Sequence, residues 1–64
     1  MKYTNIMKNK TEELLVITAE ECGELTQACS KILRHGIDDG LRSKLLEEVG
    51  DLQCMIDLLI EHDV

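Results

Sequence analysis

Two short acidic segments of this chain have nearly the same sequence. The string EECGEL begins at Glu20 and the string EEVGDL begins at Glu47. Five of the six positions are identical or exchange one acid for another. In each segment two acids stand three positions apart, a spacing that places side chains next to each other on a helix. Glu21 with Glu24 and Glu48 with Asp51 are therefore two candidate carboxylate pairs.

Carboxylates that face one another across two helices require a compensating charge. They repel and raise each other's pKa, and an ionised carboxylate on a buried surface is costly unless it is paired. A divalent cation removes both costs, and Mg²⁺ takes oxygen ligands while keeping positions for water and phosphate oxygens. Because no Glu-x-x-His motif accompanies the acids, oxygen-only ligation favours Mg²⁺, or Mn²⁺, over iron or zinc. We therefore expect a metal site made of Glu21, Glu24, Glu48 and Asp51.

The apolar residues predict the two helices that would position these acids. They recur at helical spacing, first between residues 11 and 35 and again between residues 40 and 62. Gly36 suits the left-handed position just after a helix end, and Asp38 or Asp39 can cap the helix that follows. The predicted fold class is all-α, a helical hairpin with main helices at about residues 11–35 and 40–62.

The acids have matching positions on the two predicted helices. Each residue advances about 100° around a helix, which places Glu21 and Glu48 within the apolar arcs of their helices. Glu24 and Asp51 fall at the edges of those arcs. The alternative is that the acids are solvated surface, as acid-rich helix faces usually are. We assign that role to five others: Glu12, Glu13, Glu47, Asp57 and Glu61.

Chain length indicates that one hairpin is not the whole assembly. We expect residues 1–64 to form a single domain, in which residues 1–10 are a leading helix or an arm. A chain this short buries little apolar surface. A lone hairpin leaves an apolar stripe uncovered, so we expect a homo-oligomer, a dimer or tetramer, that forms a four-helix bundle. Gly23 and Gly50 each cost a helix about 1 kcal/mol relative to alanine. Close packing of the helices is the expected reason for them.

Composition excludes several classes of partner. The formal net charge of −6 argues against nonspecific nucleic-acid binding. No apolar run is long enough for a membrane span, and the N-terminal sequence lacks the apolar stretch of a signal peptide, so a cytoplasmic protein is expected. Cys22, Cys29 and Cys54 have no CxxC spacing. We interpret them as small buried hydrophobic residues in a reducing compartment, with a disulfide or a soft-metal site as the alternative.

The combined acidic pattern resembles a known family. Glu20-Glu21-x-x-Glu24, followed further along the chain by Glu48-x-x-Asp51, is similar to the EExxE…ExxD motif of the all-α nucleotide pyrophosphohydrolases. That superfamily includes the MazG-like proteins, the dimeric dUTPases and dCTPases, and phosphoribosyl-ATP pyrophosphohydrolase. The flanking strings EECGELTQACSKILRHG and LLEEVGDL also resemble MazG-like sequences, and the similarity extends over nearly the whole chain.

The resemblance implies a function for the acids. It implies Mg²⁺-dependent cleavage of a nucleoside triphosphate or deoxynucleoside triphosphate between the α- and β-phosphates, which releases a monophosphate and pyrophosphate. Carried onto this chain, it assigns the metal to the four paired acids, with Glu21 also catalytic. Glu20 would either support the metal ligands or help to orient the attacking water. Lys31 is either a phosphate contact or a solvated cation near a helix end. The alternative function is a non-catalytic hairpin that binds metal or nucleotide, or that only mediates oligomerisation.

Overall fold

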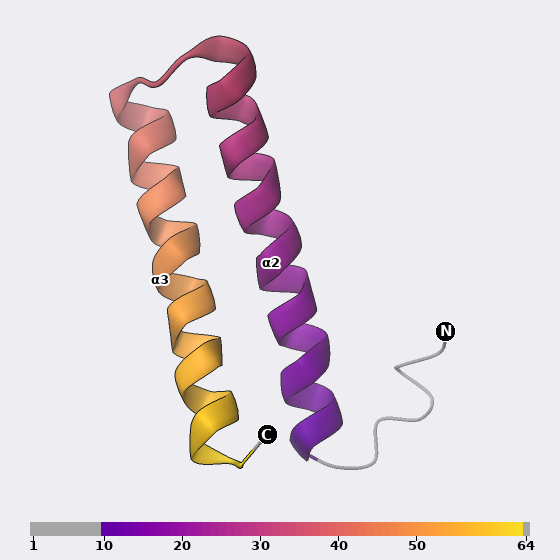
Figure 1. The fold of residues 1–64 in the computed structure, drawn as a ribbon. Coiled ribbons are helices and arrows are strands. Elements are labelled where there is room, and N and C mark those ends of the chain that lie inside the picture. Colours follow the sequence, from indigo (N-terminus) through magenta and orange to yellow (C-terminus); the bar gives the residue numbers. More distant parts are fainter. Residues whose placement is uncertain (1–9, 64) are drawn as a thin grey trace.

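The chain folds into two long helices joined by a tight turn (Figure 1). The computed structural model describes residues 10–63. Helix α2 spans Lys10–His35 and helix α3 spans Asp39–Glu61, and the two run antiparallel, side by side. The predicted all-α hairpin is confirmed, with helix ends within one residue of those expected. The predicted leading helix or arm lies, except for its last residue, outside the described residues.

Local backbone chemistry explains where the first helix ends and the second begins. Gly36 has φ of 80°, in the left-handed region that glycine adopts without a steric penalty, and its N–H donates to the carbonyl of Ile32 at 2.8 Å. Asp38 then caps α3, because its side chain accepts a hydrogen bond from the N–H of Leu41 at 2.7 Å. Of the two predicted caps, Asp38 is therefore the correct one.

The core between the helices is small and aliphatic. Among the described residues, the buried apolar side chains are Leu14 and Ala28 on α2 and Met55 on α3. The fourth buried side chain is acidic: Glu48 is only 2% exposed. A carboxyl group thus occupies a position that a hydrophobic residue would ordinarily fill, as the helical periodicity predicted.

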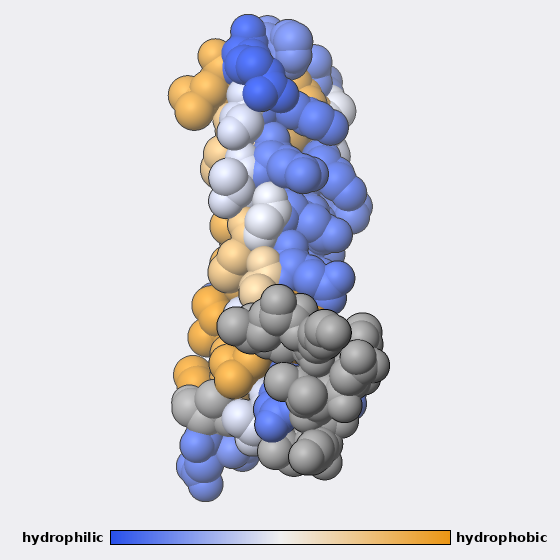
Figure 2. Space-filling model, turned by 90° about the vertical axis from the view of Figure 1, so that its right-hand side faces the viewer, coloured by the Kyte–Doolittle hydropathy of each residue, from blue (hydrophilic) through white to orange (hydrophobic). Residues whose placement is uncertain are grey.

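Many large hydrophobic side chains remain exposed on the hairpin. Figure 2 shows that hydrophobic residues gather along one side of its length and hydrophilic residues along the opposite side. A two-helix layer buries only the strips where its helices meet, so a wider apolar arc on either helix stays uncovered. The exposed large hydrophobic residues are Leu15, Leu33, Ile37, Leu46, Val49, Ile56 and Ile60.

Two sequence-based expectations about the interior are wrong for the hairpin. Cys22, Cys29 and Cys54 are exposed free thiols rather than buried hydrophobic residues, because none of them lies on the strip where α2 meets α3. Gly23 and Gly50 are not explained by close packing of the two helices, since a Cβ atom built at either position would meet nothing within 4 Å. Both glycines are exposed on the outside of their helices.

No helix within residues 10–63 is long and apolar enough to cross a membrane.

Candidate metal centre

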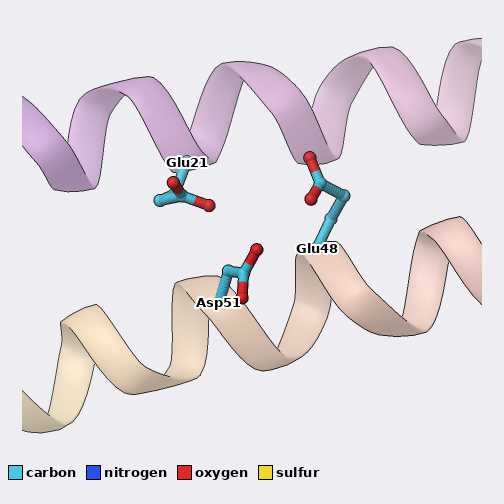
Figure 3. Close-up of side chains that lie close together, drawn as sticks. All are labelled: Glu21, Glu48 and Asp51. Carbon is cyan, nitrogen blue, oxygen red and sulfur yellow. The ribbon is translucent and has the colours of Figure 1, made fainter.

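Three of the predicted acids converge between the helices. Glu21 comes from α2, and Glu48 and Asp51 come from α3 (Figure 3). One carboxylate oxygen from each residue lies within 4.8 Å of the other two. The side chains point toward one another across the space between the helices. The two acidic segments, which are far apart in the sequence, therefore meet in the folded chain.

Helix geometry accounts for this meeting. Glu48 and Asp51 are three positions apart on α3 and therefore project from neighbouring positions of the same face. The antiparallel arrangement brings the equivalent segment of α2 alongside, so that Glu21 faces them. The site is thus made of regular helices rather than loops, which holds its ligands on a rigid support.

Electrostatics at the centre favour the addition of a positive charge. Burial raises the pKa of Glu48, because a charged carboxylate is poorly solvated there. A side-chain hydrogen bond with Glu24 and the negative charges of Glu24 and Asp51 raise it further, while Lys44 lowers it. In addition, Oε2 of Glu21 is buried and has no hydrogen-bond partner among the described residues. Such an orphaned buried oxygen is costly unless a ligand satisfies it.

The other predicted site residues lie around this cluster rather than in it. Glu24 is exposed and is not one of the three acids whose oxygens lie within 4.8 Å, although it is close enough to share a hydrogen bond with Glu48. Glu20 is exposed on α2, next to Glu21 in the chain. Lys31 is also exposed, and it lies about 15 Å along α2 from Glu21, at 1.5 Å per residue. It therefore does not belong to the cluster.

Lys44 is a neighbour of the centre that sequence reasoning missed. Its ammonium group lies 3.9 Å from Oε1 of Glu48 and 3.3 Å from Oε1 of Glu47. The hydrogen bond and the charge of Glu47 raise the pKa of Lys44, so it remains a cation. The available signal was the i, i+4 spacing of Lys44 and Glu48, which places them on one helix face.

The described carboxylates fit a hard divalent cation. Three converging carboxylates, one of which also has a buried oxygen without a hydrogen-bond partner and another of which is buried with a raised pKa, match the oxygen-only ligation that Mg²⁺ and Mn²⁺ prefer. Three protein ligands also leave positions in an octahedral shell for water and for phosphate oxygens. In this arrangement Glu21, Glu48 and Asp51 would hold the ion, and Glu24 could join them by a change of rotamer.

We expect the metal-free protein to lose stability as the pH rises. With its raised pKa, Glu48 retains a proton in the folded chain at pH values where the unfolded chain has lost it. Its contribution is therefore complete below the ordinary pKa of about 4.5 and is lost as the pH rises through the folded-state pKa. Urea denaturation in the presence of a chelator, at pH 4 to 8, measures this dependence.

The Glu48→Gln variant and the addition of Mg²⁺ test this expected pH dependence of stability. Glu48→Gln should flatten the decline in the free energy of unfolding, because glutamine does not titrate. Addition of Mg²⁺ should oppose the decline, because the ion binds the carboxylate form and displaces its proton. A wild-type profile identical to that of Glu48→Gln would contradict the assignment of the raised pKa to this residue.

Comparisons of the chain with protein-family models, with curated proteins and with solved structures found no match. What the chain does must therefore be inferred from its acidic motif and from the geometry of the three carboxylates.

Proposed function

We propose that this chain is a Mg²⁺-dependent nucleoside triphosphate pyrophosphohydrolase that converts an NTP or dNTP to a monophosphate and pyrophosphate. The observation that carries the proposal is the convergence of the Glu21, Glu48 and Asp51 carboxylates, together with a buried Glu21 oxygen that has no hydrogen-bond partner among the described residues. The reaction is inferred from the resemblance of the acidic motif to that of the all-α nucleotide pyrophosphohydrolases. Mn²⁺ is the alternative cofactor, since it accepts the same ligands.

The proposed reaction is an in-line hydrolysis at the α-phosphate. A water oxygen attacks the α-phosphorus, the bond from that phosphorus to the bridging oxygen breaks, and pyrophosphate leaves with the bond electrons. When bound, the ion would supply charge neutralisation and would lower the pKa of the attacking water. Glu21, Glu48 and Asp51 would hold the ion, and Glu20, adjacent to Glu21 in the chain, would orient the water and accept its proton. No covalent intermediate with the protein is required.

Two lysines are proposed to contact the substrate. Lys44 lies beside the acid cluster and can reach a phosphate held there. Lys31 can contact only a phosphate chain or a nucleoside that extends along α2, because its backbone lies about 15 Å along the helix from Glu21. The proximity of Lys44 to Glu48 makes it the stronger candidate for a phosphate contact.

We also propose that the active form is a homo-oligomer in which hairpins pair into four-helix bundles. The exposed apolar side chains on the hairpin support this, since such residues at a protein surface mark contact sites when they gather in one patch. Paired hairpins would also enlarge the core, which within one hairpin contains few buried apolar side chains among the described residues.

A non-catalytic metal-binding module is the second candidate. One observation favours it: the apolar groove on the hairpin is lined by Cys22, Leu25, Thr26, Cys29, Ser30, Leu33 and Leu52, and none of the acids contributes to it. The hairpin thus provides metal ligands without an adjoining nucleoside pocket in that groove. This candidate requires Mg²⁺ or nucleotide to stabilise the protein without the release of product.

One experiment separates the two candidates. The protein is incubated with Mg²⁺ and a panel of NTPs and dNTPs, pyrophosphate release is measured, and thermal stability is recorded with and without the ion. An enzyme should release pyrophosphate from at least one nucleotide, and Glu21→Gln should abolish the release while Glu61→Gln, at the exposed end of α3, retains it. Stabilisation by Mg²⁺ without product favours the binding module. No response in either measurement contradicts both.

A further inference from the structure

A second pattern runs along each helix, away from the acids. On α2 it consists of Leu15, Ala19, Cys22, Thr26, Cys29 and Leu33, and we call these residues the α2 seam. On α3 it consists of Arg42, Leu46, Val49, Gln53, Ile56 and Ile60, which we call the α3 seam. Both follow the same alternation of steps of four and three. When the strings EECGEL and EEVGDL are aligned, each position of the α3 seam coincides with one of the α2 seam.

This spacing is the repeat with which helices pack against one another over long distances. Yet all twelve seam residues are exposed in the hairpin. Two of the polar members form hydrogen bonds within their own helices: the Thr26 hydroxyl donates to the carbonyl of Cys22 at 3.0 Å, and the Gln53 amide donates to Asp57 at 2.9 Å. Thr26 thereby satisfies its hydroxyl within its own helix. Arg42, the charged member, stands at one end of the α3 seam.

The two seams lie on the same broad face of the hairpin. In an antiparallel helix pair, equivalent positions are related by a twofold axis perpendicular to the plane that contains both helices. The matched acids of α2 and α3 meet between the helices as this symmetry requires. Residues that are rotated in the same direction around their helix from Glu21 and from Glu48 therefore project from the same broad face of the hairpin. Figure 2 is consistent with this, since the hydrophobic residues line one side of the molecule and the hydrophilic residues the other.

The seams differ in the size of their side chains. The middle of the α2 seam is small, with Ala19, Cys22, Thr26 and Cys29, and most of it lines the apolar groove, whose volume is about 520 Å³. The α3 seam is larger, with Leu46, Val49, Ile56 and Ile60 exposed along it. The face thus carries a groove along one helix and a ridge along the other.

We infer that a second copy of this chain covers this face, with the α3 seam of each copy packed into the α2 groove of the other. The inference rests on the proposed pairing of hairpins and specifies its geometry. The twofold axis of the dimer would run parallel to the helices, so that both groove-and-ridge contacts form at once. An arrangement with α2 against α2 would instead place two small seams together and leave space between them.

The available area suits a second copy. Helix α3 is 23 residues long, which makes the face roughly 35 Å long, and two helices make it roughly 20 Å wide. That corresponds to about 700 Å² on each copy, or about 1,400 Å² in total, within the range of stable protein–protein interfaces. A short peptide segment would cover only part of this surface.

The symmetry also sets which residues meet. Within one hairpin Glu21 lies opposite Asp51, and Glu48 lies further along α3 toward the turn (Figure 3). A twofold axis parallel to the helices adds no shift along them, so α2 of one copy has this same register against α3 of the other. Cys22 is one residue nearer the turn than Glu21, and Val49 is two residues nearer the turn than Asp51. These two seam residues therefore lie within about 1.5 Å of the same level along the helices. They should therefore face each other across the interface.

Cysteine cross-linking tests this geometry. The chain carrying Cys29→Ser and Cys54→Ser retains only Cys22, and adding Val49→Cys places a second thiol on the α3 seam. On mild oxidation the chain with both thiols should form a disulfide-linked two-chain species that dissociates on reduction, while the chain with Cys22 alone should form little of it. Comparable cross-linking by Cys22 alone would overturn the groove-and-ridge geometry in favour of an α2-to-α2 contact.

Solution mass tests the partner itself. Light scattering of the wild-type chain should give a mass of two chains or a multiple of two, and Val49→Glu should reduce it to one chain. Gln27→Glu introduces the same side chain at an exposed position of α2 outside the seam, and it should leave the mass unchanged. A wild-type monomer would overturn both this inference and the proposed oligomer. An even-numbered oligomer with the wrong cross-links would overturn only the geometry inferred here.

Discussion

Glu48→Gln is expected to lower the Mg²⁺-dependent activity of this protein but to raise its stability in the absence of metal. The variant should lose Mg²⁺-dependent pyrophosphate release by on the order of 100-fold or more, since even residues that merely orient metal ligands change affinity or activity by about 10- to 100-fold. At neutral pH and without metal, however, it should be more stable than the wild type. The wild-type carboxylate is buried and surrounded by acids, whereas glutamine is neutral.

The opposite signs make this variant informative. Thermal unfolding with a chelator and with Mg²⁺ should show a higher midpoint for Glu48→Gln in the chelator, and a smaller rise in the midpoint on addition of Mg²⁺. Glu61→Gln, at an exposed position near the end of α3, controls for the change from acid to amide and should behave as the wild type does. A Glu48→Gln protein that retains the full response to Mg²⁺ would remove the centre of the proposed site.

Leu14→Ala should have the largest effect on folding. Leu14 is 2% exposed and belongs to a very small set of buried apolar side chains. Truncation of a buried leucine to alanine costs about 2–5 kcal/mol through lost burial and the cavity that remains. Because small domains have total stabilities of only about 5–15 kcal/mol, much of the population should unfold at moderate temperature.

Urea denaturation at fixed protein concentration measures this effect. A fixed concentration is needed because oligomerisation would make the apparent stability depend on it. Ile37→Ala is the control: Ile37 is 53% exposed in the turn and lies outside both seams, so its truncation should change the free energy of unfolding by about 0.5 kcal/mol or less. Equal effects of the two substitutions would mean that the hairpin core is not where the chain derives its stability.

The helices and the turn could be predicted because their signals are local. Apolar residues at helical spacing define each helix, Gly36 supplies the left-handed residue that ends α2, and Asp38 supplies the cap of α3. Periodicity alone left a choice between Asp38 and Asp39. The structure decides it, because the Asp38 side chain accepts the hydrogen bond from Leu41.

The acidic site was predictable in part. The repeated motif and its angular position on each helix predict that Glu21, Glu48 and Asp51 converge, and they do. The position of Glu24 outside the three-acid cluster, and of Lys44 beside it, depends on the rotamers that these two exposed side chains adopt. Periodicity gives the direction in which a side chain leaves its helix, but not where its end atoms lie.

The sequence by itself determined the two amphipathic helices, the turn between them and the placement of matching acids on equivalent faces, because each depends on residues close together in the chain. Only the tertiary structure decided which acids come within reach of one ion, and that the cysteines and the outer apolar residues stay exposed. The physical reason is that the periodicity of a helix is set by its own residues, whereas several different elements could pack against it. Which part of its apolar arc is covered depends on the helix packed against it, and a hairpin covers only one strip of each helix.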